Sequence, residues 1–93
     1  MWDNIDAVKH ANKALGQHWF SEDTMAFHGS EVVSKLYAGQ YFVTSEDNFD
    51  RTRKVFSVRQ AQPDGGVETI GEYGGWNTLE DALVCVGSIV GAP

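Results

Sequence analysis

The residues best suited to chemistry in this chain are three histidines, one cysteine and a short run of acids. His10, His18 and His28 lie eight and ten residues apart, which matches no compact metal-ligand spacing. Cys85 has no histidine at helical spacing to activate it as a nucleophile, so we interpret it as a core residue. The segment 46–50 lacks the central glycine and the distal glutamate of a calcium-binding loop. We therefore expect no catalytic residues, no metal and no cofactor.

Two sets of charged residues are candidates for binding. Seven Lys and Arg residues stand against thirteen Asp and Glu residues, and a net charge of −6 attracts basic proteins and repels nucleic-acid backbones. We predict a partner-binding acidic surface that contains Glu22, Asp23, Glu46, Asp47, Asp50, Glu68 and Glu72. Four basic residues within nine positions form the alternative, a nucleic-acid-binding stretch that contains Arg51, Arg53, Lys54 and Arg59.

The C-terminal half predicts a β-hairpin followed by an amphipathic helix. Residues 54–60 alternate as a strand does, Pro63-Asp-Gly-Gly is typical of a turn, and residues 67–73 form the returning strand. Apolar residues then recur at helical spacing from Leu79 to Val90, with the Asn77-Thr78 corner as the helix cap. Such a helix must bury its apolar stripe, and one face of the hairpin is the nearest surface.

The N-terminal segment predicts a helix from about residue 4 to 15, capped by Asp3 and ended by Gly16. A short helical turn follows, capped by Ser21 and ended by Gly29. Four large apolar side chains accompany this turn, and we interpret them as core residues that close one end of the sheet. An exposed aromatic patch is the alternative. These side chains are Trp19, Phe20, Met25 and Phe27.

The middle of the chain predicts two further strands, residues 31–37 and 41–45, joined by a tight turn. The fold class is therefore α+β. We expect a four-stranded antiparallel β-meander with an N-terminal and a C-terminal helix packed on one face, in the order α-turn-β-β-β-β-α. At 93 residues the chain should form a single domain, residues 1–93.

Length and hydropathy indicate a soluble protein. The chain has no apolar run close to the roughly 18 residues of a membrane span, and its N-terminus lacks the basic start of a signal peptide. Because Cys85 is the single cysteine, no disulfide can form within the chain, which is typical of a reducing compartment. We expect a cytoplasmic location and no membrane association.

The sequence resembles a family of small uncharacterised proteins encoded by bacteriophages and other mobile elements of bacteria. The motifs that carry this resemblance are His18-Trp-Phe-Ser-Glu-Asp-Thr-Met, Tyr41-Phe-Val-Thr-Ser-Glu, Phe56-Ser-Val-Arg and Thr69-Ile-Gly-Glu-Tyr. The similarity covers most of residues 17–86. It implies a bacterial host cell as the setting and transfers no catalytic residue.

Acidity, the lack of a catalytic constellation and this resemblance together favour a non-enzymatic accessory protein. Our leading hypothesis is that it binds a host protein, one that handles nucleic acid, as anti-CRISPR or anti-restriction inhibitors do. The alternative is a small DNA-binding accessory protein that uses its sheet and the basic stretch 51–59, since the last three strands and helix resemble the arms of integrase-type DNA-binding domains. A virion component that forms a homodimer through an exposed edge strand is a third hypothesis.

Overall fold

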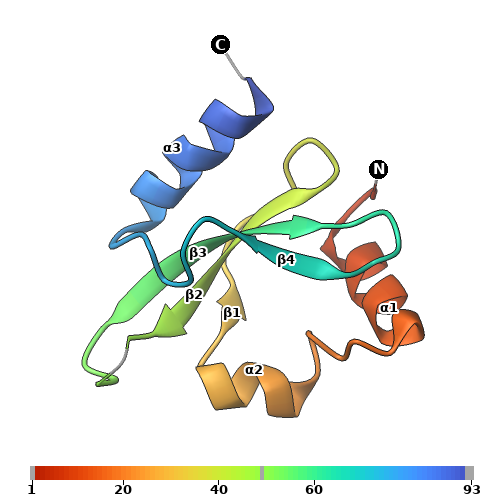
Figure 1. Cartoon of the computed structure of the whole chain (residues 1–93), viewed down its shortest axis with the longest axis horizontal. Helices are drawn as coiled ribbons and strands as arrows, with labels where there is room; N and C mark the ends of the chain where they lie inside the picture. Colours follow the sequence, from red (N-terminus) through yellow and green to blue (C-terminus); the bar gives the residue numbers. More distant parts are fainter. Residues whose placement is uncertain (1, 49, 92–93) are drawn as a thin grey trace.

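The part of the chain that the structure describes folds as a four-stranded antiparallel sheet with three helices, as the apolar patterns predict (Figure 1). The computed structural model describes residues 2–48 and 50–91. The strands lie in the sheet in their sequence order, so the predicted meander and the α+β order are confirmed. The elements are α1 (Ile5–Leu15), α2 (Glu22–His28), β1 (Glu31–Val32), β2 (Tyr41–Asp47), β3 (Lys54–Ala61), β4 (Val67–Ile70) and α3 (Leu79–Val90).

The two long helices cover opposite faces of the sheet. Val8 of α1 packs with Phe42 of β2, whereas Val86 of α3 packs with Val43. Because successive residues of a strand point to opposite faces, α1 and α3 must lie on different sides. Figure 1 shows α3 on one side of the sheet and α1 and α2 on the other. The prediction that both helices share one face is wrong, since an apolar stripe shows that a helix is buried and not which face it covers.

Three polar side chains cap the helices. Ser21 Oγ accepts a hydrogen bond from Thr24 N at the start of α2, and Thr78 Oγ1 accepts one from Asp81 N at the start of α3. These two caps confirm the prediction. The cap of α1 is Asn4 and not Asp3. Left-handed glycines end the helices: Gly16, Gly29 and Gly91.

Two strands are shorter than predicted, and the early end of the second places Tyr73 in a loop. The first strand stops at Val32, because the Ser34 hydroxyl accepts the hydrogen bond of Val43 N at 2.8 Å. Strand β4 stops at Ile70, and Trp76 takes the next place beside β3 by exchanging two backbone hydrogen bonds with Phe56. Residues 71–75 consequently leave the sheet as a loop that carries Tyr73.

Gly87 lies inside α3, where glycine is a poor helix former. A Cβ atom at this position would meet no atom within 4 Å apart from its chain neighbours and the backbone of α3 itself. Gly87→Ala is therefore expected to raise the free energy of unfolding by about 0.5–1 kcal/mol, measured by urea denaturation. An unchanged or lowered stability would show that the glycine serves close packing of α3.

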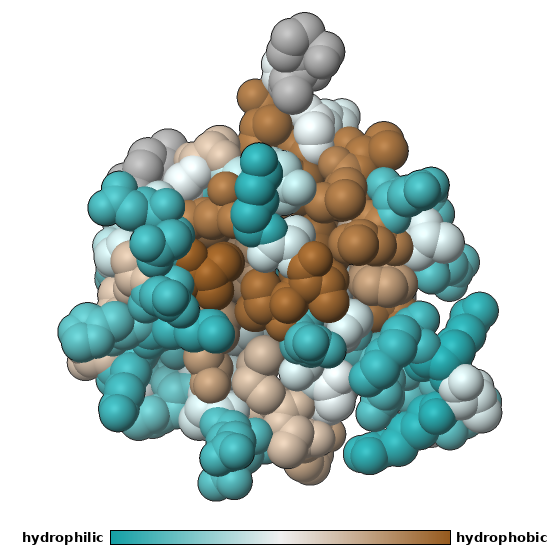
Figure 2. All heavy atoms as spheres, turned by 180° about the vertical axis from the view of Figure 1, so that it is seen from behind, coloured by the Kyte–Doolittle hydropathy of each residue, from teal (hydrophilic) through white to brown (hydrophobic). Residues whose placement is uncertain are grey.

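Among the described residues, several large hydrophobic side chains are exposed to solvent. Val84 of α3 is 72% exposed and Phe27 of α2 is 74% exposed. Figure 2 shows hydrophobic side chains gathered in the upper part of the molecule, where α3 lies. Among residues 2–48 and 50–91, no helix has the length and hydrophobicity of a membrane span.

Candidate functional site

A buried ion pair lies on the face of the sheet that α1 and α2 cover. The Nη2 atom of Arg59 on β3 is 2.7 Å from Oε1 of Glu46 on β2, and these side chains are 5% and 0% exposed. The strand register places Thr44 beside Ser57 on the same face, because residues two apart on a strand point the same way. Charges removed from water in this manner are costly unless they are fully hydrogen-bonded.

Hydrogen bonds from three strands hold this pair. Arg59 Nε donates to Thr44 Oγ1 at 3.0 Å, and Arg59 Nη1 donates to Thr69 Oγ1 of β4. Ser57 Oγ donates to Glu46 Oε2 at 2.9 Å. Among the described residues, every buried side-chain nitrogen and oxygen has a hydrogen-bond partner. The network therefore fixes the guanidinium group in one position.

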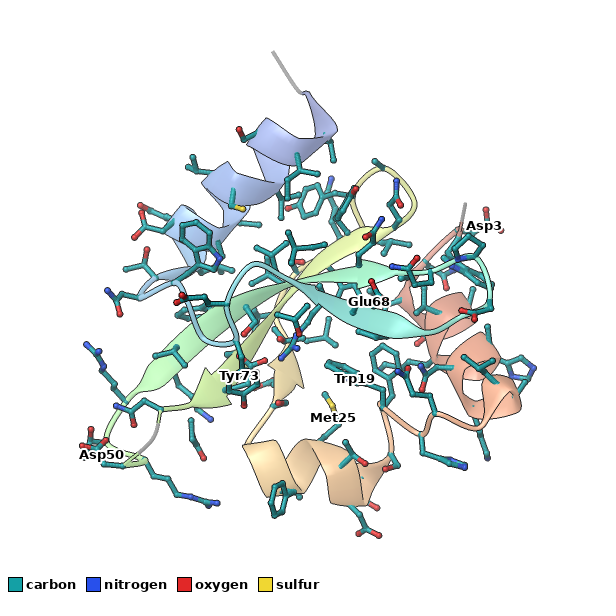
Figure 3. The ribbon with its side chains drawn as sticks, viewed as in Figure 1. Asp3, Trp19, Met25, Asp50, Glu68 and Tyr73 are labelled. Carbon is teal, nitrogen blue, oxygen red and sulfur yellow. The ribbon has the colours of Figure 1, made fainter. Side chains whose placement is uncertain are left out.

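Two aromatic rings lie against the guanidinium group of Arg59. Its Cζ atom is 5.1 Å from the centre of the Trp19 ring and 5.3 Å from the centre of the Tyr73 ring, which are cation-π distances. In Figure 3, Trp19 and Tyr73 come from different connections and border the space between α2 and the sheet, with Met25 beside Trp19. The buried arginine thus organises residues from distant parts of the chain.

These residues surround a small hollow of about 160 Å³, which we call the aromatic pocket. It is lined by Trp19, Thr24, Met25, Ser30, Arg59 and Tyr73. Burial, and then the negative charge of Glu46, raise the pKa of the Tyr73 phenol above its ordinary value of 10.0, so the phenol is protonated at neutral pH. Small-molecule sites usually measure about 300–1,000 Å³. The aromatic pocket is therefore better suited to a single side chain than to a small-molecule ligand.

Helix α2 forms one wall of the aromatic pocket and also presents an outer face. Thr24 and Met25 line the pocket. Asp23 and Phe27 are four residues apart and therefore share a side of the helix, and both are exposed. We call Asp23, Ala26 and Phe27 the outer face of α2.

The predicted acidic surface is only partly present. Glu46 is fully buried, so its assignment to that surface is wrong. Asp47 lies 2.8 Å from Lys54, whose hydrogen bond lowers the pKa of the Asp47 carboxyl. Hydrogen bonds from Thr52 lower the pKa of the Asp50 carboxyl in the same way. The other predicted residues are exposed at two places, Glu22 and Asp23 at the start of α2, and Glu68 and Glu72 along and after β4.

The alternative basic stretch is also divided. Arg59 is 4% exposed and bound to Glu46, so its assignment to a nucleic-acid-binding surface is wrong. The reason is that α1, α2 and their connections cover the sheet face that it occupies. Lys54 is held by Asp47 and by the carbonyl of Gly29. Arg51 and Arg53 remain exposed between β2 and β3.

No group of three or more His, Cys, Asp or Glu residues in the described part of the chain is arranged to hold a metal ion. The side chain of His28 lies outside that described part. Cys85, which the sequence analysis interprets as a core residue, is half-buried and packs against the apolar cluster between α3 and the sheet.

A family model described as a family of unknown function (DUF7447) matches residues 4–86. No curated protein matches the sequence, and no solved structure matches the fold. The matched range includes α1, α2, the whole sheet and the aromatic pocket.

Proposed function

The chain belongs to the DUF7447 family, and we propose that it acts by contact, binding a protein partner through the aromatic pocket and the outer face of α2. The observation that carries this proposal is the buried Arg59, which is held by three strands and two aromatic rings at the base of the pocket. A site fixed before binding loses little conformational entropy when a partner docks.

The size and composition of the surface support a protein partner. A pocket of about 160 Å³ accepts one anchoring side chain, and the adjoining Phe27 is 74% exposed on α2. Aromatic anchors beside such pockets carry much of the binding energy in protein interfaces. Tyr73, which is half-exposed, offers a further aromatic contact at the rim.

The charge of the molecule favours a basic partner. Arg59 and Glu46 neutralise each other inside the protein, so the net charge of −6 belongs to the remaining side chains. Such a field speeds association with a positively charged surface. A host protein that handles nucleic acid has a positively charged surface of this kind. The protein would then bind that surface in the bacterial cytoplasm as an anti-defence inhibitor of the anti-CRISPR or anti-restriction type.

Affinity capture from a bacterial host lysate tests the proposal. The wild-type protein should retain a partner, and Phe27→Ala should lower the retained amount by about tenfold, because truncating an interface anchor costs roughly 1–2 kcal/mol. The matched control is Val84→Ala, which removes an equally exposed apolar side chain from α3. Equal retention by wild type and Phe27→Ala, or loss with Val84→Ala instead, would contradict the proposed surface.

A further inference from the structure

A second, larger hollow of about 330 Å³ lies between α1 and the turn that follows it. It is lined by Lys9, Asn12, Lys13, His18, Phe20 and Ser21, and we call it the basic pocket. Three basic side chains thus gather at one place on a protein whose net charge is −6. We propose that the basic pocket binds the phosphate group of a small phosphorylated molecule.

The pocket is built by a buried asparagine. Asn12 is 1% exposed, and its Oδ1 accepts a hydrogen bond from Trp19 N at 2.8 Å while its Nδ2 donates to Gly65 O at 2.9 Å. These bonds fold the turn back along α1 and bring His18 to the side of α1 that carries the lysines. His18 has a φ of 55°, a left-handed conformation that costs a residue with a side chain roughly 1–2 kcal/mol. Backbone strain of this kind concentrates at functional sites.

The basic side chains of the pocket take part in no ion pair among the described residues. Among the residues that the structure describes, no carboxylate oxygen lies within 4 Å of Lys9, Lys13 or His18. Lysines at positions i and i+4 repel each other on a helix. Lys13 also complements the dipole at the end of α1, but this explains neither Lys9, one turn earlier, nor His18, beyond the helix. An anion with two negative charges would neutralise the two lysines and could accept a hydrogen bond from the His18 ring.

The ligand should be a small molecule and not a nucleic-acid polymer. Charges more than about 8 Å away are largely screened at physiological salt, so the local cations decide the binding of a compact anion. A polymer would instead extend over the rest of a molecule that carries a net negative charge. The volume of about 330 Å³ is at the lower end of the range for small-molecule sites, about 300–1,000 Å³. Phe20, whose ring is 5.9 Å from Lys9 Nζ, offers an apolar surface to the organic part of the ligand.

Titration of ¹⁵N-labelled protein with inorganic phosphate and, separately, with 5′-AMP at constant ionic strength tests this site. Both should shift the amide signals of residues 9–21 in a saturable manner. Lys13→Gln should raise both dissociation constants about tenfold, the effect of one lost charge-assisted hydrogen bond. Lys35→Gln removes the same charge from an exposed lysine between β1 and β2 and should change neither. If 5′-AMP binds more tightly than inorganic phosphate, its nucleoside also contacts the protein. If the two affinities are equal, the pocket recognises the phosphate group alone.

His18→Gly separates binding from folding. Glycine adopts a φ of 55° without strain, so the melting temperature should not fall, whereas phosphate binding should weaken severalfold. Absence of saturable shifts, equal weakening by Lys35→Gln, or shifts with duplex DNA but not with 5′-AMP would overturn the proposal. The partner capture proposed above depends on α2 and is unaffected by either result.

Discussion

Arg59→Met is expected to lower the free energy of unfolding by about 3–5 kcal/mol, because it leaves the fully buried Glu46 charge without its partner. The substitution keeps most of the side-chain volume, so lost packing is a minor contribution. It also removes the donors to Thr44 and Thr69. Urea denaturation followed by circular dichroism measures the effect.

The double variant Glu46→Leu/Arg59→Met provides the control. Replacing both charges with apolar groups leaves no buried ion, so the double variant should be more stable than Arg59→Met alone. A loss below about 1 kcal/mol in Arg59→Met, the range of an exposed ion pair, would show that water reaches Glu46. The pair would then not fix the aromatic pocket.

Phe42→Ala is expected to cost about 3–5 kcal/mol. Phe42 is fully buried on β2 and contacts the rings of Trp19 and Phe20, at 6.1 and 6.0 Å between ring centres. Its removal leaves a cavity between α1 and the sheet and loosens the Trp19 wall of the aromatic pocket. The shift of the urea midpoint reports the loss.

Phe27→Ala is the matched control for Phe42→Ala. It makes the same change at a residue that is 74% exposed, so the stability should change by no more than about 0.5 kcal/mol. Similar losses in the two variants would contradict the placement of Phe42 in the core and Phe27 at the surface. This control also ensures that loss of partner capture in Phe27→Ala is not caused by unfolding.

The elements of the fold could be predicted because their signals are local. Ser21 and Thr78 cap helices by bonds to backbone groups three residues away, and the strand alternation from Lys54 is visible in the sequence itself. Strand ends were predicted less well, since they depend on distant partners. The bridge between Phe56 and Trp76 ends β4 early, and its residues lie twenty positions apart.

The candidate site could not be predicted because it depends on which faces the helices cover. With α1 and α3 on one face, Arg59 would point to solvent, and it was assigned to an exposed surface. Glu46 was placed in a loop after a strand expected to end at Ser45, whereas β2 continues to Asp47 and carries Glu46 into the interior. With the helices on opposite faces, both faces of β2 and β3 are buried, and the two charges meet across the strand pair. The sequence does contain a signal, since each strand has polar residues at alternate positions, Thr44 and Glu46 on β2 and Ser57 and Arg59 on β3, and Thr44 lies directly opposite Ser57.

We propose that the protein binds its partner through the aromatic pocket and the outer face of α2. Hydrogen–deuterium exchange of the protein alone and in complex with the captured partner tests this binding surface. When the partner is bound, exchange should become slower in residues 22–28 and in the loop that carries Tyr73. Slower exchange confined to α3, with residues 22–28 unchanged, would contradict it.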